Sequence, residues 1–491
     1  QRVFPKGSWS IVLWKFSISM MLDDFFQAVF TRIQTYVDSQ HDDIPLTPST
    51  PSSSLRKTLD LKLPIEGMGL ENTLNDIDVF LENSTRTHAP GFMNPLWGGL
   101  SPAGLSGEFV ASATNNSMYT RDLSPIASLI EVEIIHRACE LTGYSEGFGT
   151  FTSGGSNGNL MGLLCARQHA IHDSGLNGFD GSKHVIFVSE ESHYSVMMAA
   201  NVTGLGRQNV LKIRCDASGA MVVDHLEEEI QFAIREGFTP LCIMATAGTT
   251  VRGAFDPITD IVRTAKKYDI WCHVDAAWGG MALFSSKNRH LIEGIQDSDS
   301  MCWDAHKMMG LPLTSSIFLV RDVHILRKVC AHTTNADYLF YDAEDQVDLG
   351  HFSLQCARRN DVLKLWLAWR EIGDAGWAKL LERYLELATY LESIVDQHEQ
   401  LEMMSSRVWS NVCFRFTDGS QDETLDELNA EIRERLKREG HFMVSRASIR
   451  GRTVIRAVIA NNAVTEETIQ QFVEQIVRIG NDISRGLPPK S

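Results

Sequence analysis

Residues 241–277 read LCIMATAGTTVRGAFDPITDIVRTAKKYDIWCHVDAA and contain a strand–helix–strand pattern that decides the fold. The two end runs, LCIMATAG and IWCHVDAA, are short and almost wholly apolar, as strands buried on both faces are. The segment between them, PITDIVRTAKKY, has the spacing of a crossover helix. Further strands are expected at HVIFVSE (184–190), NVLKI (209–213) and SSIFLV (315–320), with another helix at EEIQFAIREG (228–237). This alternation predicts an α/β unit with a largely parallel sheet.

The rest of the chain is expected to form an N-terminal arm, a connection and a second unit. The apolar run Trp9–Met21 is interrupted by Lys15 and predicts an amphipathic arm rather than a signal peptide. Residues 42–64 are rich in Pro, Ser and Thr, which favours an extended strap. The predicted parts are the arm and strap (1–66), a large domain (67–345), a connecting loop (346–365) and a small C-terminal α/β domain (366–491).

The composition argues against several classes of partner. With 45 basic and 62 acidic residues the formal net charge is −17, so we expect no broad basic surface for nucleic acid. The apolar N-terminal run is shorter than the about 20 residues of a membrane-spanning helix. Nine cysteines, with no Cys-x-x-Cys pair and no clustered His/Cys spacing, predict reduced thiols in a cytoplasmic protein and no metal site. A reactive thiol is a second interpretation for Cys302 and Cys356.

Lys307 lies in SMCWDAHKMMGLPLTSSIFLVR, residues 300–321, and is the first candidate functional residue. An isolated lysine is most often a solvated surface charge. Here the neighbours include a tryptophan, two methionines and two leucines, so we expect a desolvated amine with a lowered pKa. Such an amine suits Schiff-base formation with a carbonyl compound.

Asp275 ends the apolar run IWCHV and is the second candidate. A buried carboxylate costs several kcal/mol unless a cation meets it. The protonated pyridine nitrogen of a cofactor is one such cation. A helix N-cap or a structural salt bridge is the ordinary alternative for an aspartate after a strand.

Two further segments carry candidate binding groups. The glycine-rich segment TSGGSNGN (152–159) precedes an uninterrupted helical pattern, so its backbone N–H groups and the helix N-terminus suit a phosphate, although a simple turn explains the glycines equally well. His193, in SEESHYS, follows the strand expected at 184–190. A lone histidine is more often structural, but an imidazole stacked on a cofactor ring holds the ring and transfers protons.

Together these segments resemble the group II pyridoxal 5′-phosphate (PLP) dependent amino-acid decarboxylases, over about residues 70–483. The likeness is greatest to the glutamate and cysteine sulfinate branch. It is carried by DAHK (304–307), HVDAAWGG (273–280), ATAGTTVRGAFDPI (245–258), SEESHYS (189–195), FTSGGSNGN (151–159) and LQCARRNDVLKLW (354–366). The resemblance implies the aspartate-aminotransferase-type fold (fold type I), with a mostly parallel seven-stranded sheet, a smaller C-terminal α/β domain and an N-terminal helical arm. It also implies an obligate homodimer with active sites at the subunit interface.

The resemblance assigns roles position by position. Lys307 is implied to be the Schiff-base lysine, Asp275 the partner of the pyridine nitrogen and His193 the imidazole stacked on the ring. The remaining implied contacts are Ala277 on the opposite ring face, Thr246 near the ring substituents, Gly155, Ser156 and His306 near the phosphate, and Arg456 and Asn94 near the substrate.

Four positions depart from the family pattern. Ser315 stands where a Cys or Ala is usual in the family. Asp304 stands where many relatives have Asn, and Pro95 replaces a Gln that relatives present to the distal carboxylate of the substrate. In the loop between residues 338 and 356, the predicted catalytic loop, Val347 stands where glutamate decarboxylases carry a proton-donating Tyr. Tyr341 and His351 are the candidate replacements.

The sequence therefore predicts a PLP-dependent carboxy-lyase that acts on a small acidic L-amino acid: aspartate, cysteine sulfinate or glutamate. Three alternatives stay open at this stage. The substrate is another L-amino acid, aromatic or diamino; the enzyme consumes oxygen and forms an aldehyde; or the chain binds PLP as a scaffold without turnover. The last is disfavoured because a scaffold has no need for Lys307, Asp275, His193 and His306 together.

Overall fold

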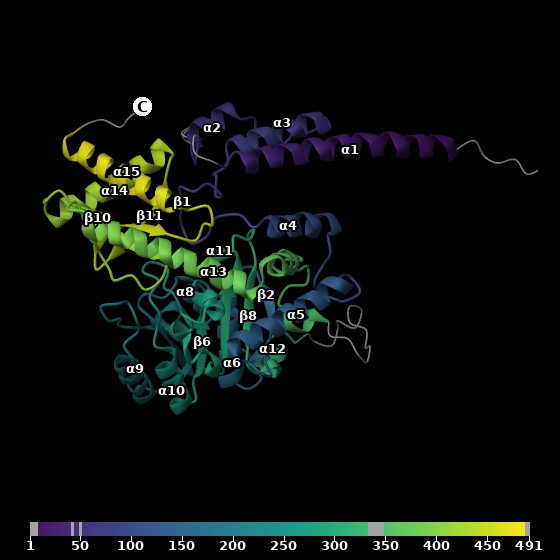
Figure 1. Ribbon diagram of the computed structural model, residues 1–491. Coiled ribbons are helices and arrows are strands. Elements are labelled where there is room, and N and C mark those ends of the chain that lie inside the picture. The colour runs from purple at the N-terminus through teal and green to yellow at the C-terminus, as the bar shows by residue number, and fades with distance from the viewer. Residues whose placement is uncertain (1–7, 41–43, 49–51, 332–347, 487–491) are drawn as a thin grey trace, which may run out of the picture.

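The computed structural model describes residues 8–40, 44–48, 52–331 and 348–486 of the 491-residue chain. The structure consists of a large unit, a smaller unit and a set of N-terminal helices (Figure 1). No helix in these ranges is long and apolar enough to cross a membrane.

A seven-stranded sheet forms the centre of the large unit, in the order β2-β8-β7-β6-β5-β3-β4. Neighbours from β7 to β4 are parallel, whereas β8 is antiparallel to both β7 and β2, so the predicted mostly parallel sheet is confirmed. The strands are β2 (Phe148–Thr152), β3 (Lys183–Ser189), β4 (Val210–Ile213), β5 (Phe238–Thr246), β6 (Trp271–Asp275), β7 (Ser300–Asp304) and β8 (Ser316–Val320). β2 was not expected because glycine and threonine interrupt its apolar character, and β7 was not expected because Ser300 and Asp304 leave only three apolar residues between them.

Helices cover both faces of this sheet and make two separate apolar cores. Along β5, Ile243 and Ala245 face one core, whereas Cys242 and Met244 face the other, as the alternation of a strand requires. The helices of this unit are α5 (Pro125–Thr142), α6 (Gly155–Ala170), α7 (Ser174–Asn177), α8 (Ser195–Val202), α9 (Val223–Arg235), α10 (Ile258–Tyr268), α11 (Ala305–Met308) and α12 (Val323–Val329). Short 3-10 turns are η1 (Arg207–Asn209), η2 (Gly279–Phe284), η3 (Arg289–Ile292), η4 (Ile295–Asp297) and η5 (Leu349–Phe352).

A second sheet, in the order β1-β11-β12-β10-β9, forms the smaller unit. Its strands and helices are β1 (Phe92–Met93), β9 (Leu401–Met403), β10 (Asn411–Phe416), β11 (Met443–Ile449), β12 (Arg452–Val458), α14 (Asp422–Glu439) and α15 (Glu466–Ser484). β1 pairs in parallel with β11, with Phe92 opposite Met443. Residues 92–93, which we expected in the large domain, therefore belong to the smaller sheet, because both side chains are buried against it.

The long helix α13 (Val362–Gln397) joins the two units. It packs against α4 and α5 and also against α15, β9 and β10, and Figure 1 shows it crossing between the two units. Gly373, with φ 64°, kinks it. The domain boundary predicted at residue 366 falls inside this helix, so the two units share one continuous element.

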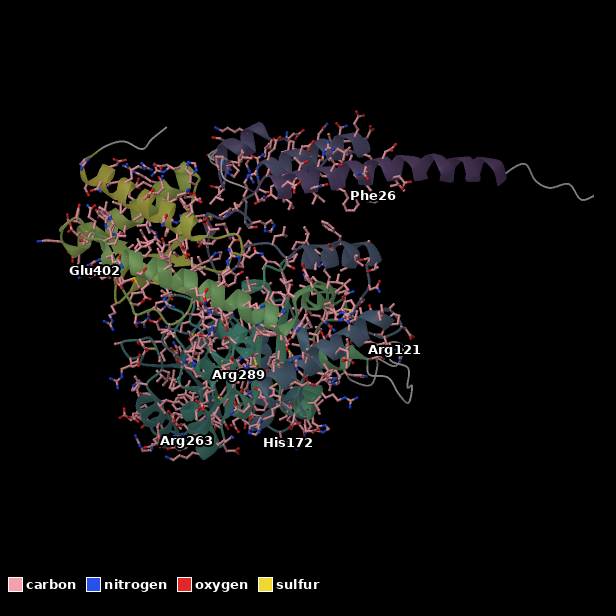
Figure 2. All side chains as sticks on the ribbon, viewed as in Figure 1. Phe26, Arg121, His172, Arg263, Arg289 and Glu402 are labelled. Carbon is pink, nitrogen blue, oxygen red and sulfur yellow. The ribbon has the colours of Figure 1, made fainter. Side chains whose placement is uncertain are left out.

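The N-terminal part is helical, as predicted, and consists of α1 (Ser8–Asp38), α2 (Ser52–Thr58), α3 (Gly69–Glu82) and α4 (Pro102–Thr114). α2 lies inside the segment that we expected to be an extended strap. Arg32 of α1 forms an ion pair with Asp78 of α3 at 2.7 Å, and the Phe30 ring packs on Phe109 of α4. The far end of α1 extends beyond the rest of the protein (Figure 1), and Phe26, labelled on α1 in Figure 2, is 52% exposed.

Candidate active site

Three neighbouring strands of the large sheet end side by side and carry candidate residues at their carboxyl ends. Thr246 of β5 pairs with Asp275 of β6, and Asp275 pairs with Cys302 of β7, two residues before Asp304. Lys307 follows in the single turn of α11. Ligands of open α/β sheets bind at this edge, so the structure brings the candidates together where such a site is expected.

Asp275 is buried, with 7% of its surface exposed. Asn159 Nδ2 donates a hydrogen bond to its Oδ2 at 2.7 Å, and the backbone N–H of Ala277 donates to its Oδ1 at 3.1 Å. Among the described residues, no basic side chain forms an ion pair with it within 4.0 Å. This buried carboxylate is therefore held by neutral donors and is suited to a cationic ligand.

Lys307 is held by a neighbouring acid. Its Nζ lies 3.1 Å from Oδ2 of the buried Asp304. Burial lowers the pKa of Lys307, but the negative charges of Asp304 and Asp275 outweigh burial and leave the pKa raised. The lowered pKa expected from the apolar neighbours is thus wrong for the protein without ligand. Burial also raises the pKa of Asp304, but the charges of Lys307 and His306 outweigh it and lower that pKa.

His193 lies in the turn before α8. Its Nδ1 accepts a hydrogen bond from the backbone N–H of Ser195 at 3.3 Å and lies 2.8 Å from Ser195 Oγ. Burial lowers the pKa of His193, and the nearby charges of Asp275 and Asp304 offset only part of this effect. The imidazole is therefore neutral at neutral pH.

The glycine-rich segment forms the start of α6, as predicted. Gly154 has φ 133°, and a Cβ added to Gly155 would lie 2.8 Å from Ala277 Cβ and 3.0 Å from Asp304 Oδ2. Gly155, Ala277 and Asp304 thus meet at the end of the helix, where only a glycine leaves space. Ser156 is exposed in the first turn. The positive end of the α6 dipole faces this edge of the site.

His306 is buried and is fixed by its own turn. Its Nδ1 lies 3.1 Å from the backbone N and 2.8 Å from the backbone O of Ser315, and its Nε2 lies 3.9 Å from Asp304 Oδ2. Burial lowers the pKa of His306, although Asp304 raises it in part.

Arg456 and Asn94 form a second group, contributed by the smaller unit. Arg456 is 5% exposed and donates to the backbone oxygen of Thr250, to Pro95 O at 3.3 Å and to Ser445 Oγ at 2.7 Å. The Ser445 hydroxyl in turn donates to Asn94 Oδ1. Thr250 lies in the loop that follows Thr246, the last residue of β5. This loop therefore connects the residues at the ends of β5, β6 and β7 with Arg456 and Asn94.

The remaining candidates divide into four cases. Tyr341 and Val347 lie outside the described residues. His351 lies in η5 and is partly buried. Cys302 is buried, and burial raises its thiol pKa well above the usual value, so the reactive interpretation is wrong for this cysteine. Cys356 is exposed.

A family model described as the pyridoxal-dependent decarboxylase conserved domain matches residues 51–417. The chain belongs to the pyridoxal-dependent decarboxylases. Human cysteine sulfinic acid decarboxylase is 35% identical over 446 residues, 87% of this chain and 90% of that protein. Acidic amino acid decarboxylase GADL1 of Bos taurus is 34% identical over 449 residues, 88% and 86% of the two chains. The crystal structure of mouse CSAD in apo form matches with a TM-score of 0.89 at 31% identity, over 95% of this chain and 99% of that one.

This pyridoxal-dependent decarboxylase is thus a PLP-dependent carboxy-lyase that acts on an amino acid, and the predicted family, fold and cofactor are confirmed. The residues present fit PLP. Lys307 offers an amine for its aldehyde, the buried Asp275 has no basic ion-pair partner in the described ranges, and the space beside Gly154, at the start of α6, is open to a phosphate. Within those ranges, no group of three or more His, Cys, Asp or Glu side chains could hold a metal ion.

Sequence reasoning missed two residues of the decarboxylase site, Asn159 and Ser195. Asn159 Nδ2 donates to both Asp275 Oδ2 and Ser195 Oγ, at 2.7 and 2.8 Å. Asn159 stands in the quoted glycine-rich segment, where its position one turn into a helix could have directed attention to its side chain. Ser195 is the last residue of the quoted segment SEESHYS, and only its contacts in the folded protein distinguish it from the other serines there.

Proposed function

We propose that this decarboxylase converts a small acidic L-amino acid, aspartate, cysteine sulfinate or glutamate, to the amine and CO2. The observation that carries the proposal is Arg456, a buried guanidinium with no ion-pair partner among the described residues. Its hydrogen bonds go to neutral oxygens of Thr250, Pro95 and Ser445. A buried cation held only by neutral groups is stabilised by an anionic ligand, and a guanidinium suits a carboxylate. The names of two relatives, cysteine sulfinic acid decarboxylase and acidic amino acid decarboxylase, support the same substrate class.

Lys307 is the proposed attachment point of the cofactor, as a Schiff base. Its position beside the ends of β6 and β7 supports this role. With PLP bound, Lys307 would hold its aldehyde carbon, and a substrate amine would take over that bond and free the lysine amine. Asp304, 3.1 Å away, is then its counter-ion. The same ion pair would hold Lys307 aside while the carboxylate leaves.

PLP supplies the electron sink for the bond between Cα and the departing carboxylate. In the proposal, Asp275 keeps the pyridine nitrogen protonated, and its carboxylate is already oriented by Asn159 and Ala277. His193, whose pKa is lowered by burial, and Ala277 would contact the two ring faces. The remaining contacts are proposed for Thr246 near the ring substituents and for Gly155, Ser156 and His306 near the phosphate.

The substrate acids are proposed to bind at Arg456 and Asn94. Ser445 Oγ accepts from Arg456 Nη2 and donates to Asn94 Oδ1, so the Asn94 amide turns its Nδ2 donor away from Ser445. A guanidinium and an amide donor together suit a ligand with more than one acidic group. Pro95 supplies only a backbone oxygen here, which it gives to Arg456.

The test is a panel of L-amino acids, with aspartate, cysteine sulfinate and glutamate beside aromatic and diamino substrates, on the PLP-loaded protein. We expect equal amounts of amine and CO2 from acidic substrates, and loss of both turnover and the visible absorbance of bound PLP in Lys307→Ala. Turnover of aromatic or diamino substrates alone would overturn the substrate assignment. Oxygen uptake with ammonia release would instead indicate the aldehyde-forming reaction, and an unchanged spectrum in Lys307→Ala would remove that lysine from its role.

A homodimer is proposed as the working form. Apolar side chains of the segment between α2 and α3 are exposed in the single chain, with Leu63 at 95% and Ile65 fully exposed, and Phe80 of α3 is also exposed. Such a surface favours burial against a second copy. Sedimentation of the full chain tests this, and a monomer at micromolar concentration would overturn it. The cytoplasmic location stays a prediction.

A further inference from the structure

A buried chain of hydrogen bonds connects Asp275 to His193 and continues to the far end of β6. Asn159 lies at its centre. Its Nδ2 donates to Asp275 Oδ2 at 2.7 Å and to Ser195 Oγ at 2.8 Å, which uses both amide hydrogens. Its Oδ1 lies 3.0 Å from His273 Nε2 and accepts from the Cys302 thiol at 3.3 Å.

The chain continues from His273 to a group that can only donate. His273 Nδ1 lies 2.9 Å from Ser300 Oγ, and Trp271 Nε1 donates to the same oxygen at 2.9 Å. An indole N–H has no acceptor atom. The members of the chain other than His193 are buried, and His193 itself is partly exposed.

The positions of the hydrogens follow from three groups whose role as donor or acceptor is fixed: the Asp275 carboxylate, the Trp271 indole N–H and the Ser195 backbone N–H. The Asp275 carboxylate only accepts, so Asn159 turns Nδ2 toward it and Oδ1 toward His273. His273 therefore carries its proton on Nε2, and Ser300 donates to Nδ1 while accepting from Trp271. At the other end the backbone N–H of Ser195 donates to His193 Nδ1, so Ser195 Oγ accepts from Asn159 and donates to that same nitrogen. The proton of neutral His193 is thus on Nε2.

His273 is well suited to hold this arrangement. It is fully buried, and burial lowers its pKa to about 4, so it stays neutral across the range in which a decarboxylase works. A Cβ added to Gly162 of α6 would lie 2.5 Å from His273 Nδ1, so the ring is packed directly against the helix that carries Asn159. The His273 ring and the Asn159 amide are therefore held in a fixed position relative to each other.

We propose that Asn159 is a positioning residue whose single amide, oriented by His273, fixes the carboxylate of Asp275 and, through Ser195 Oγ, reinforces the tautomer of His193 that the backbone N–H of Ser195 also favours. This inference rests on the proposed roles of Asp275 and His193 toward PLP. Its consequence is that the two groups are coupled, because a change in the amide alters the acid at the pyridine nitrogen and the imidazole together.

The test compares Asn159→Ala, Asn159→Asp, His273→Phe and His273→Gln in the full-length protein. Asn429→Ala is the matched control, because Asn429 is an equally buried amide that bonds only the backbone of Phe416 and Leu425 in the smaller unit. The readouts are PLP affinity, the pH midpoint of the visible absorbance of bound PLP, the nitrogen-15 signals of histidine in PLP-free protein, and the melting temperature.

We expect Asn159→Ala to weaken PLP binding roughly 10- to 100-fold, as loss of a hydrogen bond to a charged group does. Its pH midpoint should move by about one unit. Asn159→Asp, which turns an acceptor toward Asp275, should be worse than Ala although it fills the space better. A merely structural residue would give the opposite order. His273→Gln, which keeps a donor for Asn159, should retain more affinity than His273→Phe.

An unchanged pH midpoint and PLP affinity in Asn159→Ala would overturn the inference, as would a His193 signal with the proton on Nδ1. Asn429→Ala should lower the melting temperature without moving the midpoint. If wild type binds PLP through Lys307 and only the Asn159 effects fail, the proposed function stands and this inference falls. If wild-type absorbance does not depend on Lys307, the proposed function itself fails.

Discussion

Lys307 Nζ lies 3.1 Å from Asp304 Oδ2, across a single helical turn at the end of β7. Because Asp304 raises the pKa of Lys307, Asp304→Asn should lower that pKa and leave more neutral amine at pH 8. The PLP-free variant should then take up PLP about tenfold faster, a change equivalent to one pKa unit. Stopped-flow absorbance against pH measures this. Asp299→Asn, just before the other end of β7, is the control, and equal pH profiles for Asp304→Asn and wild type would contradict the expectation.

Replacement of Arg456 should affect substrate more than cofactor. Arg456→Met keeps much of the volume but removes the charge, so we expect kcat/KM for an acidic substrate to fall about 100-fold or more. Arg456→Lys should recover part of it, since a point charge cannot bond two oxygens side by side. The visible absorbance of bound PLP should stay unchanged in both. Equal losses of PLP and of activity would instead show a general collapse of the site.

The ion pair of Arg252 with Glu191 should stabilise the loop that carries His193. Arg252 is buried and donates to both oxygens of Glu191, at 2.6 and 3.2 Å. Glu191→Ala leaves the guanidinium without its partner and should lower the free energy of unfolding by roughly 2–3 kcal/mol. The exposed pair Asp260–Arg263, the latter labelled in Figure 2, is the control, and Asp260→Ala should change little. Urea unfolding measures both, and similar effects would contradict the prediction.

Acid should destabilise the protein through His273. Its pKa is about 4 in the folded state and near 6.5 when unfolded, so the unfolded chain binds the extra proton between these values. Stability is therefore fully present above pH 6.5 and falls as the pH drops toward 4, by a contribution on the order of 3 kcal/mol. His273→Gln removes this contribution. Its melting temperature should fall less between pH 7 and pH 5 than that of wild type, and parallel curves would argue against it.

A methyl group at Gly155 should block the site while sparing the fold. The added Cβ of Gly155→Ala would lie 2.8 Å from Ala277 Cβ and 3.0 Å from Asp304 Oδ2. We expect PLP affinity to fall at least about tenfold, because neighbouring side chains must move. Gly175→Ala meets only contacts of 3.8 Å and longer and serves as the control. Equal affinity in both variants, measured by fluorescence titration, would show that the helix end tolerates a side chain.

The sequence predicted the strands that are apolar on both faces and the residues beside them. β5 and β6 are such strands, which is why Thr246 and Asp275 could be placed at the edge of the sheet. β7 was missed because only three apolar residues lie between Ser300 and Asp304. The strand is nevertheless fully buried, since its two polar ends are bonded or paired inside the protein.

Contacts between distant segments could not be predicted in the same way. Asn159 meets its partners Ser195, His273 and Asp275 across 36, 114 and 116 residues of sequence. The predicted direction of the pKa shift of Lys307 was wrong for a related reason. Apolar neighbours in sequence describe burial, but the sign of the shift depends on the side chain of Asp304 turning back toward the amine, which only the folded turn shows.

The pairing of β1 with β11 determines when this enzyme is complete during synthesis. Phe92 and Asn94 leave the ribosome long before Met443 and Ser445. Phe92 pairs with Met443 in the small sheet, and Asn94 accepts a hydrogen bond from Ser445. A nascent chain that stops short of β11 therefore has every strand of the large sheet but lacks Ser445 and Arg456 of the proposed substrate site. Neither unit can be excised by one cut, because the C-terminal half would lose a strand that the N-terminal half carries.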